Sequence, residues 1–176
     1  MNKVYIGTSL DGFIADKNGA LDFLDTIKIP EGVDMGYHAF MDSIDALLMG
    51  KNTFETVAGF DVEWPYQKPV YVLSNSLEAI PEKFQNKAFL VKGALKEVIN
   101  ELNQKGHESI YIDGGKLIQS CLEEDLIDEM IITTIPVLIG GGIKLFGELS
   151  EHLEFELVSS QVFADHIVQN HYKRKS

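Results

Sequence analysis

The sequence predicts a three-layer α/β/α fold around a mixed, mainly parallel sheet of about eight strands, which ends in an antiparallel hairpin. Two observations support this prediction. Strand-like and helix-like segments alternate between Val70 and Ile135, a pattern that favours parallel strands with helices on both faces. Two extended runs with little helical pattern then follow over 152–175 and predict the hairpin. With no repeats or linkers, we expect one domain over 1–176.

The first elements follow from local patterns. An apolar strand from Lys3 breaks at Asp11-Gly12, a turn-forming pair. A helix is expected from Asp34, because apolar residues then recur at helical spacing. These residues are Tyr37, Phe40, Met41 and Ile44. A short buried strand over 45–50 leads directly into a helix over 51–60.

The alternating part of the chain supplies the remaining elements. Segments rich in β-branched and aromatic residues predict strands over 69–75, 87–91, 109–113 and 128–135. Helices are expected over 94–106 and 116–122. The first of these has Gly106 as its C-terminal cap. Its apolar face consists of Leu95, Val98, Ile99 and Leu102.

Charge and composition exclude several classes of function. The formal net charge is −12, which argues against binding to nucleic acid or to an anionic membrane. Cys121 is the single cysteine, so we expect no disulfide framework. The five histidines lack metal-ligand spacing, and no metal is expected. No segment has the length of a membrane span and the N-terminus lacks a signal pattern, so we expect a cytoplasmic protein.

Two short stretches point to nucleotide binding. In both 47–55 (LLMGKNTFE) and 110–117 (IYIDGGKL), an apolar strand stops at glycine and a helix begins. Such a turn offers unpaired backbone N–H groups and the positive end of a helix dipole, which favour phosphate. Two of them in one small chain indicate a nucleotide with more than one phosphate. The G-x-G-x-x-G, P-loop, H-E-x-x-H and G-x-S-x-G motifs are absent.

The order of motifs resembles the dihydrofolate reductase superfamily, and within it the branch that includes the reductase domain of riboflavin biosynthesis. The shared elements run from SLDG and MGKNTFE through DGG and LIDE to the glycine triplet followed by KLF. The resemblance implies NADPH as cofactor and assigns residues to it. The first strand and its loop, which would line the nicotinamide, correspond to Thr8, Ser9, Leu10, Ile14 and Ala15. The turns that would hold phosphates correspond to Gly50, Lys51, Asn52, Thr53, Gly114, Gly115, Lys116 and Leu117. The loop beside the adenosine 2′-phosphate corresponds to Ser74, Asn75 and Ser76.

Some of these assignments have plain structural alternatives. Lys51 stands where the family usually has arginine, so the preference for NADPH over NADH is open. The serines around position 75 are also ordinary turn residues. Gly140-Gly141-Gly142 either contacts the site or is a flexible loop.

Asp34 is the candidate catalytic acid. It precedes Gly50 by sixteen residues, the spacing of the pterin-binding acid in true dihydrofolate reductases, and would supply a proton. The alternative is a helix cap, a position where aspartate is common. On the same helix, Tyr37 and His38 are candidates for lining the substrate cleft. Trp64 either covers one end of that cleft or packs a surface loop.

The resemblance implies an NADPH-dependent oxidoreductase that acts on a small heterocyclic or glycosylamine substrate. The substrate is either the 5-amino-6-(5-phosphoribosylamino)uracil of riboflavin synthesis or a pterin or folate. A second hypothesis is a non-catalytic NADP(H)-binding protein, and a third is a purely structural domain, since a fold alone does not fix an activity. We expect a homodimer, a common state of soluble enzymes.

Overall fold

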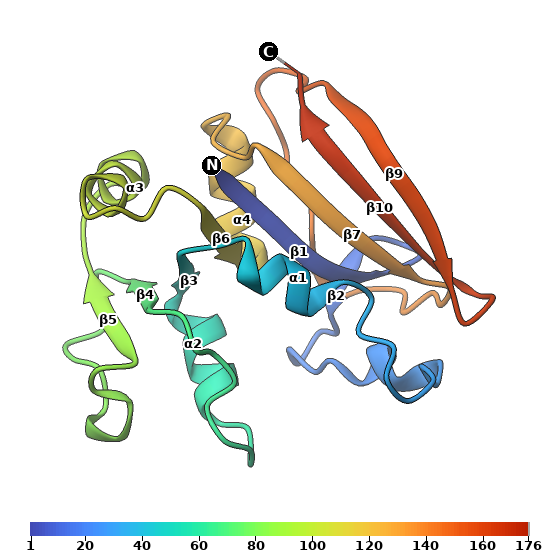
Figure 1. Cartoon of the computed structure of the whole chain (residues 1–176), viewed down its shortest axis with the longest axis horizontal. Coiled ribbons are helices and arrows are strands. Elements are labelled where there is room, and N and C mark those ends of the chain that lie inside the picture. Colours follow the sequence, from blue (N-terminus) through green and yellow to red (C-terminus); the bar gives the residue numbers. More distant parts are fainter. Residues whose placement is uncertain (176) are drawn as a thin grey trace.

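The computed structural model describes residues 1–175 and contains an eight-stranded sheet (Figure 1). Its spatial order is β5-β4-β3-β6-β1-β7-β10-β9. The first six of these strands run parallel, and β10 and β9 are antiparallel to their neighbours. The strands are β1 (Asn2–Ser9), β3 (Ala46–Gly50), β4 (Val70–Leu73), β5 (Ala88–Val91), β6 (Ile110–Asp113), β7 (Glu129–Ile135), β9 (Phe155–Phe163) and β10 (Ile167–Arg174). The predicted mixed α/β sheet with an antiparallel C-terminal hairpin is confirmed.

Helices cover both faces of this sheet, which produces two main cores. Side chains alternate across each strand, so Leu48 of β3 enters one core while Leu47 and Met49 enter the other. Helices α3 (Leu95–Gln104) and α4 (Gly115–Glu123) pack over Leu48. Helices α1 (Tyr37–Asp42) and α2 (Lys51–Ala58) pack over the opposite face. None of the helices in residues 1–175 has the length and apolar character of a membrane span.

Short elements that the sequence patterns did not predict complete the fold. Two 3₁₀ helices, η1 (Asp22–Thr26) and η2 (Glu82–Phe84), lie in connecting segments. A separate two-stranded sheet joins β2 (Phe13–Ala15) to β8 (Ile143–Lys144). The glycine triplet at 140–142 is therefore held beside the first loop: a Cβ on Gly142 would lie 2.1 Å from the Ala15 carbonyl oxygen.

The terminal hairpin contains a β-bulge. The pairing of β10 with β9 shifts between His171, which faces Ser159, and Tyr172, which faces Leu157. Val158 is the extra residue of β9, so the alternation of side chains between the two faces of the sheet is shifted by one residue at that point. As a result, Phe163 packs with the cluster around Phe23, whereas Phe155 packs with the α3/α4 core.

Candidate active site

The site is built where three neighbouring parallel strands end. Strand β6 lies between β3 and β1, so Gly50, Asp113 and Ser9 share the carboxyl edge of the sheet (Figure 1). Ligands of open α/β sheets bind at this edge. The sheet topology thus brings both glycine turns and the first loop together, although 41 or more positions separate them in sequence.

The two glycine turns are in direct contact. Gly114 has a φ of 99°, and a Cβ there would lie 2.2 Å from the Thr53 hydroxyl oxygen in the first turn of α2. Only glycine fits this position. Gly114 and Gly50 are the N-cap residues of α4 and α2, and neither helix start has a side-chain cap. A Cβ on Gly50 would meet nothing within 4 Å, so the space before α2 is open.

The first loop packs against the second of these turns. A Cβ on Gly115 would lie 2.7 Å from Ile14 and 3.2 Å from Ile143. The Asp11 carboxylate ties this loop to the segment after β7 by accepting the backbone N–H groups of Ile139 (3.2 Å) and Gly140 (2.8 Å). The same carboxylate accepts the Ser9 hydroxyl at 2.6 Å, and these bonds hold its pKa below the usual value. Asp11 therefore fixes one wall of the site.

The remaining predicted cofactor residues differ in their surroundings. Lys51 pairs with Glu55 of its own helix at 3.7 Å, and Lys116 is exposed in the first turn of α4. Ser74 is buried, and its hydroxyl accepts the backbone N–H of Leu77 at 3.0 Å, which shapes the turn after β4. Thr8 is also buried, and it lines a groove on the α3/α4 face. The backbone at the end of β1 lies at the carboxyl edge of the sheet, whereas the Thr8 side chain lines the groove.

Asp113, the last residue of β6, is a functional candidate that the motif comparison did not single out. Burial raises the pKa of its carboxyl to about 6, despite hydrogen bonds from the Gly114 N–H and the Tyr66 hydroxyl. Burial, and after it the Asp113 charge, raise the pKa of Tyr37 and Tyr66, and the effect of that charge places these phenols on its side of the site. An acid ending an otherwise apolar strand, directly before two glycines, is the sequence signal that would have identified it.

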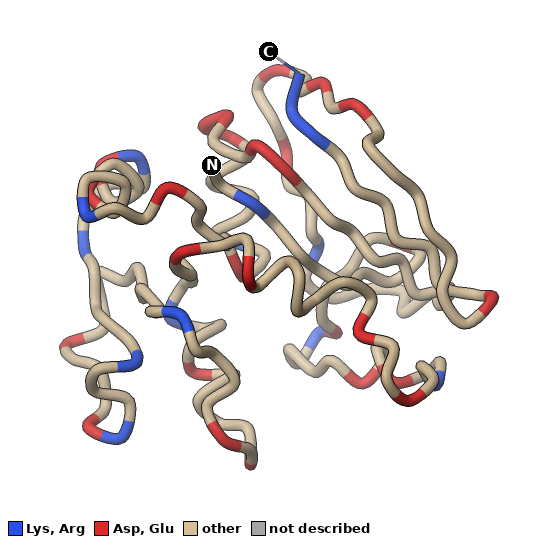
Figure 2. Tube along the Cα trace, viewed as in Figure 1, with Lys and Arg blue, Asp and Glu red and all other residues tan. Residues whose placement is uncertain are grey.

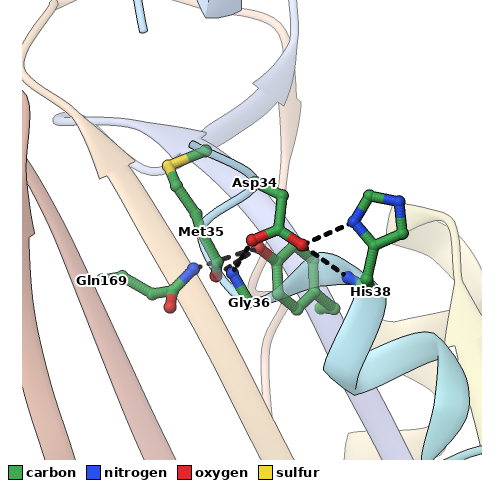
Figure 3. Close-up of polar contacts among 6 residues, drawn as sticks. Asp34, Met35, Gly36, His38 and Gln169 are labelled. Carbon is green, nitrogen blue, oxygen red and sulfur yellow. Dashed lines mark hydrogen bonds and ion pairs between the residues drawn. The ribbon is translucent and has the colours of Figure 1, made fainter. Parts of the chain in front are cut away.

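Asp34 has the contacts of a helix cap (Figure 3). Its carboxylate accepts the backbone N–H groups of Gly36 and His38, both at 3.0 Å, and contacts His38 Nδ1 at 2.6 Å. These bonds, the one from the His38 N–H first, lower the pKa of Asp34 to about 2. The helix itself begins only at Tyr37, three residues later than the expected start. The geometry favours the capping alternative, because a carboxyl with this pKa is ionised at neutral pH.

The two predicted substrate residues separate in the structure. Tyr37 turns inward, and its ring meets the edge of Tyr5 with the centroids 5.5 Å apart. The Tyr5 hydroxyl donates to the Met35 carbonyl at 2.9 Å and accepts from Gln169 at 3.2 Å (Figure 3). His38 instead is 85% exposed beside Asp34. Tyr37 thus faces the Asp113 side of the site, and His38 faces solvent.

Trp64 closes an aromatic cluster behind Tyr66. Its ring packs against Phe84 at 4.9 Å, Tyr66 at 5.4 Å and Phe54 of α2 at 6.0 Å. The indole therefore contacts α2, the helix that follows Gly50, and the ring of Tyr66, whose hydroxyl donates a hydrogen bond to Asp113. Among residues 1–175, no group of three or more His, Cys, Asp or Glu side chains is arranged to hold a metal ion.

Comparison with known proteins places this geometry in a family. The model of the RibD C-terminal domain matches residues 4–169. The chain belongs to the RibD C-terminal domain family. Membership of this riboflavin-pathway, reductase-like family accounts for the presence of both motifs, at 50–53 and at 113–115, on one dihydrofolate reductase-like sheet.

Solved structures resemble the chain over its whole length. A crystal structure from Shewanella sp. PV-4, of a protein named for riboflavin biosynthesis, is 51% identical, with a TM-score of 0.97 and 99% of each chain covered. A Thermotoga maritima diaminohydroxyphosphoribosylaminopyrimidine deaminase/5-amino-6-(5-phosphoribosylamino)uracil reductase is 14% identical, with a TM-score of 0.77; the match covers 99% of this chain and 56% of that one. Enterococcus faecalis dihydrofolate reductase, complexed with NADP(H) and RAB-propyl, is 16% identical, with a TM-score of 0.68, and the match covers 100% of this chain and 97% of that one. The last two likenesses concern the fold alone.

Proposed function

We propose that this protein is an NADPH-dependent reductase of a small heterocyclic or glycosylamine substrate. The observation that carries the proposal is the packing of two uncapped helix starts around one partly buried acid, Asp113. The helix starts suit the phosphates of a dinucleotide, and the acid suits proton transfer at neutral or mildly acidic pH.

The residues present fit the proposed cofactor. The open space at Gly50 leaves room for a phosphate against the first turn of α2, and the missing side chain at Gly115 lets Ile14 of the first loop pack against the start of α4. The N–H groups of Lys51, Asn52 and Thr53 would bind phosphate oxygens at one turn. Those of Gly115, Lys116 and Leu117 would do so at the other. Ser74, Asn75 and Ser76 would flank the adenosine end. The E. faecalis enzyme, whose name includes NADP(H), supports this choice through its fold.

The first loop would hold the nicotinamide end of the cofactor. Backbone groups of Ser9 and Leu10, with the side chains of Ile14 and Ala15, would form this wall, which Asp11 fixes. When bound, the nicotinamide would supply the hydride. The chain would orient the substrate and exclude water with the rings of Tyr5 and Tyr37, which already pack edge to face.

Asp113 would hold the proton that the reduced substrate takes up. A carboxyl with a pKa of about 6 is protonated in about half of the molecules at pH 6 and in about a tenth at pH 7, whereas Asp34, whose pKa is about 2, is ionised over this range. The Tyr66 hydroxyl, which donates a hydrogen bond to Asp113, would orient the carboxyl. The proton would therefore come from β6, beside the turn that we assign to the cofactor.

The structure favours the pyrimidine of riboflavin synthesis over a pterin. A pterin requires an acid free to bind its ring, and both oxygens of Asp34 are engaged within the chain. The substrate in the name of the T. maritima relative, 5-amino-6-(5-phosphoribosylamino)uracil, supports the first choice. A non-catalytic NADP(H)-binding protein is the alternative function.

The test is a titration with NADPH and NADH, followed by fluorescence of Trp64, the single tryptophan. Saturable binding is expected, weakened in Lys51→Ala and abolished in Gly115→Asp, whose side chain would collide with Ile14. Oxidation of NADPH in the presence of 5-amino-6-(5-phosphoribosylamino)uracil would then support reduction. Binding without oxidation by this or any pterin would favour the non-catalytic alternative, and no binding would refute both.

A further inference from the structure

Gln169 connects the C-terminal hairpin to the candidate site. It lies in β10, where the register pairs it with Thr133 of β7. Its side-chain amide nitrogen donates to the Thr133 hydroxyl at 2.9 Å and to the hydroxyl of Tyr5, in β1, at 3.2 Å (Figure 3). An amide nitrogen carries two hydrogens, so these two bonds use both of them. One side chain thus links three neighbouring strands on the face of the sheet that α1 and α2 cover.

The strands around Gln169 carry no charge in their middle. Residues 157–164 and 167–172 contain no Asp, Glu, Lys or Arg, and this part of the hairpin is tan in Figure 2. Hydroxyl groups, and not charges, therefore hold the Gln169 amide. Thr133 is buried, which protects its bond to the amide from water.

The hydrogen bonds of the Tyr5 hydroxyl have a fixed direction. Because Gln169 donates to the phenol oxygen, the phenol proton is directed to the Met35 carbonyl, at 2.9 Å. Burial raises the pKa of Tyr5, so the phenol keeps this proton at neutral pH. The result is a directed chain of hydrogen bonds, from the Gln169 amide through the Tyr5 hydroxyl to the backbone of Met35.

This chain ends at a turn with an unusual backbone. Met35 has a φ of 52°, in the left-handed region that residues other than glycine rarely adopt, and Gly36 has a φ of 82°. The Asp34 carboxylate fixes one side of the turn through the Gly36 N–H, and the Tyr5 hydroxyl fixes the other through the Met35 carbonyl. Tyr37 follows directly, and its ring packs against the ring of Tyr5. The placement of both rings therefore depends on the Tyr5 hydroxyl.

We propose that Gln169 is a positioning residue for the substrate. It acts through Tyr5, which holds the turn that precedes Tyr37. This inference rests on the proposed function, which assigns the rings of Tyr5 and Tyr37 to the substrate. Strand β10 and the strands that lead into the cofactor turns, β3 and β6, lie on opposite sides of β1. Loss of the Gln169 hydrogen bonds should therefore affect the substrate and leave the cofactor in place.

The test is the variant Gln169→Glu, which has nearly the same size but, when ionised, no proton to donate. Tyr5 then donates to the new carboxylate, and the Met35 carbonyl loses this donor. With 5-amino-6-(5-phosphoribosylamino)uracil, KM should rise about tenfold, the effect of one lost hydrogen bond, and kcat should change less. The Kd for NADPH should stay within about twofold of wild type. Gln161→Glu is the matched control, because Gln161 is the exposed partner of Gln169 in β9 and receives the same charge.

The variant Tyr5→Phe breaks the same chain of hydrogen bonds from its other end and keeps the ring. It should raise KM by a similar factor, and Gln169→Glu should add little in the Tyr5→Phe background, because both changes remove one path. A residue that only stabilises the hairpin would instead give independent effects that multiply. An unchanged KM in Gln169→Glu, an equal rise in Gln161→Glu, or multiplied effects in the double variant would each overturn the proposal.

Amide hydrogen exchange tests the positioning without turnover. Gln169→Glu should speed exchange at the N–H groups of Gly36, Tyr37 and His38, which belong to the turn, and leave β7 and β10 protected. Faster exchange across β7 and β10 with an unchanged turn would mean a purely structural role and overturn the proposal. A wild-type protein that oxidises no NADPH with this substrate would refute the proposed function, and the exchange pattern would still decide whether Gln169 holds the turn.

Discussion

The substitution Gly50→Asp should stabilise the protein and abolish cofactor binding at the same time. Gly50 has φ −78° and ψ 166°, which any residue adopts, and open space for a side chain. An aspartate there would cap α2, which has no side-chain cap. Replacing glycine at an N-cap gains a few tenths of a kcal/mol, and a negative charge near the helix start adds about 0.3–1 kcal/mol. The gain of about 1 kcal/mol corresponds to a rise of roughly 2–4 °C in Tm.

The same carboxylate would repel a bound phosphate. Two unit charges about 4 Å apart interact by about 4 kcal/mol at an effective dielectric constant near 20, which weakens binding about a thousandfold. The assay combines thermal unfolding with an NADPH titration of Trp64 fluorescence.

Ala94→Asp is the matched control for this experiment. Ala94 is the exposed, uncapped start of α3, where a new aspartate should add at least about 1 kcal/mol of stability and leave the Kd for NADPH unaltered. If Gly50→Asp bound NADPH as tightly as wild type, the phosphates would not lie at α2 and the reasoning would fail.

Three carboxylates give further predictions. If Asp113 donates the proton, kcat falls as pH rises through about 6, and Asp113→Asn lowers kcat about a hundredfold or more and removes that limb from the pH profile; an unchanged profile would exclude the role. Native Asp113 also binds its proton more tightly than Asp113 of the unfolded chain. The Asp113 contribution to stability against urea should therefore be lost as the pH rises from about 4 to about 6 in wild type, and Asp113→Asn should lack this loss; equal slopes of stability against pH in the two proteins would contradict the raised pKa. Asp34→Ala should lower Tm by loss of the cap, Asp34→Asn should largely preserve it, and both should retain kcat; loss of kcat in Asp34→Asn would restore Asp34 as the proton source. Asp11→Asn presents an amide to the Ile139 and Gly140 N–H groups, so KM for NADPH should rise and proteolysis near 139–142 should quicken; a variant identical to wild type in both would show that the loop is held otherwise.

Most of the fold could be predicted from sequence, because its long elements have strong local patterns. The apolar face of α3 and the strands β3, β6 and β7, which carry no charge apart from Asp113 and Glu129 at their ends, leave little choice of structure. The pairing of β2 with β8 could not be predicted, because strands of two or three residues have no periodicity and these lie about 130 positions apart. The bulge at Val158 likewise has no compositional signal.

The site could be predicted less completely. Family motifs identified the glycine turns, but their contact through Gly114 and Thr53 depends on the sheet order. Asp34 was chosen by its spacing from Gly50, and spacing does not reveal that its oxygens bind Gly36 and His38. The chemistry of Asp113 depends on burial, which a single acidic letter in a sequence does not encode. Whether the cofactor binds as proposed stays a prediction.

The contact between Gly114 and Thr53 also limits how the molecule moves. Gly114 lies at the start of α4 and Thr53 in the first turn of α2, and the strands before these helices, β6 and β3, are hydrogen-bonded neighbours. The Thr53 side chain occupies the space that a Cβ on residue 114 would need. We therefore expect the starts of α2 and α4 to move together as a ligand enters or leaves. Opening should instead come from segments outside these two helix starts, such as 59–68, which carries Trp64 and Tyr66. Amide hydrogen exchange should accordingly be slow at both helix starts and faster along that segment.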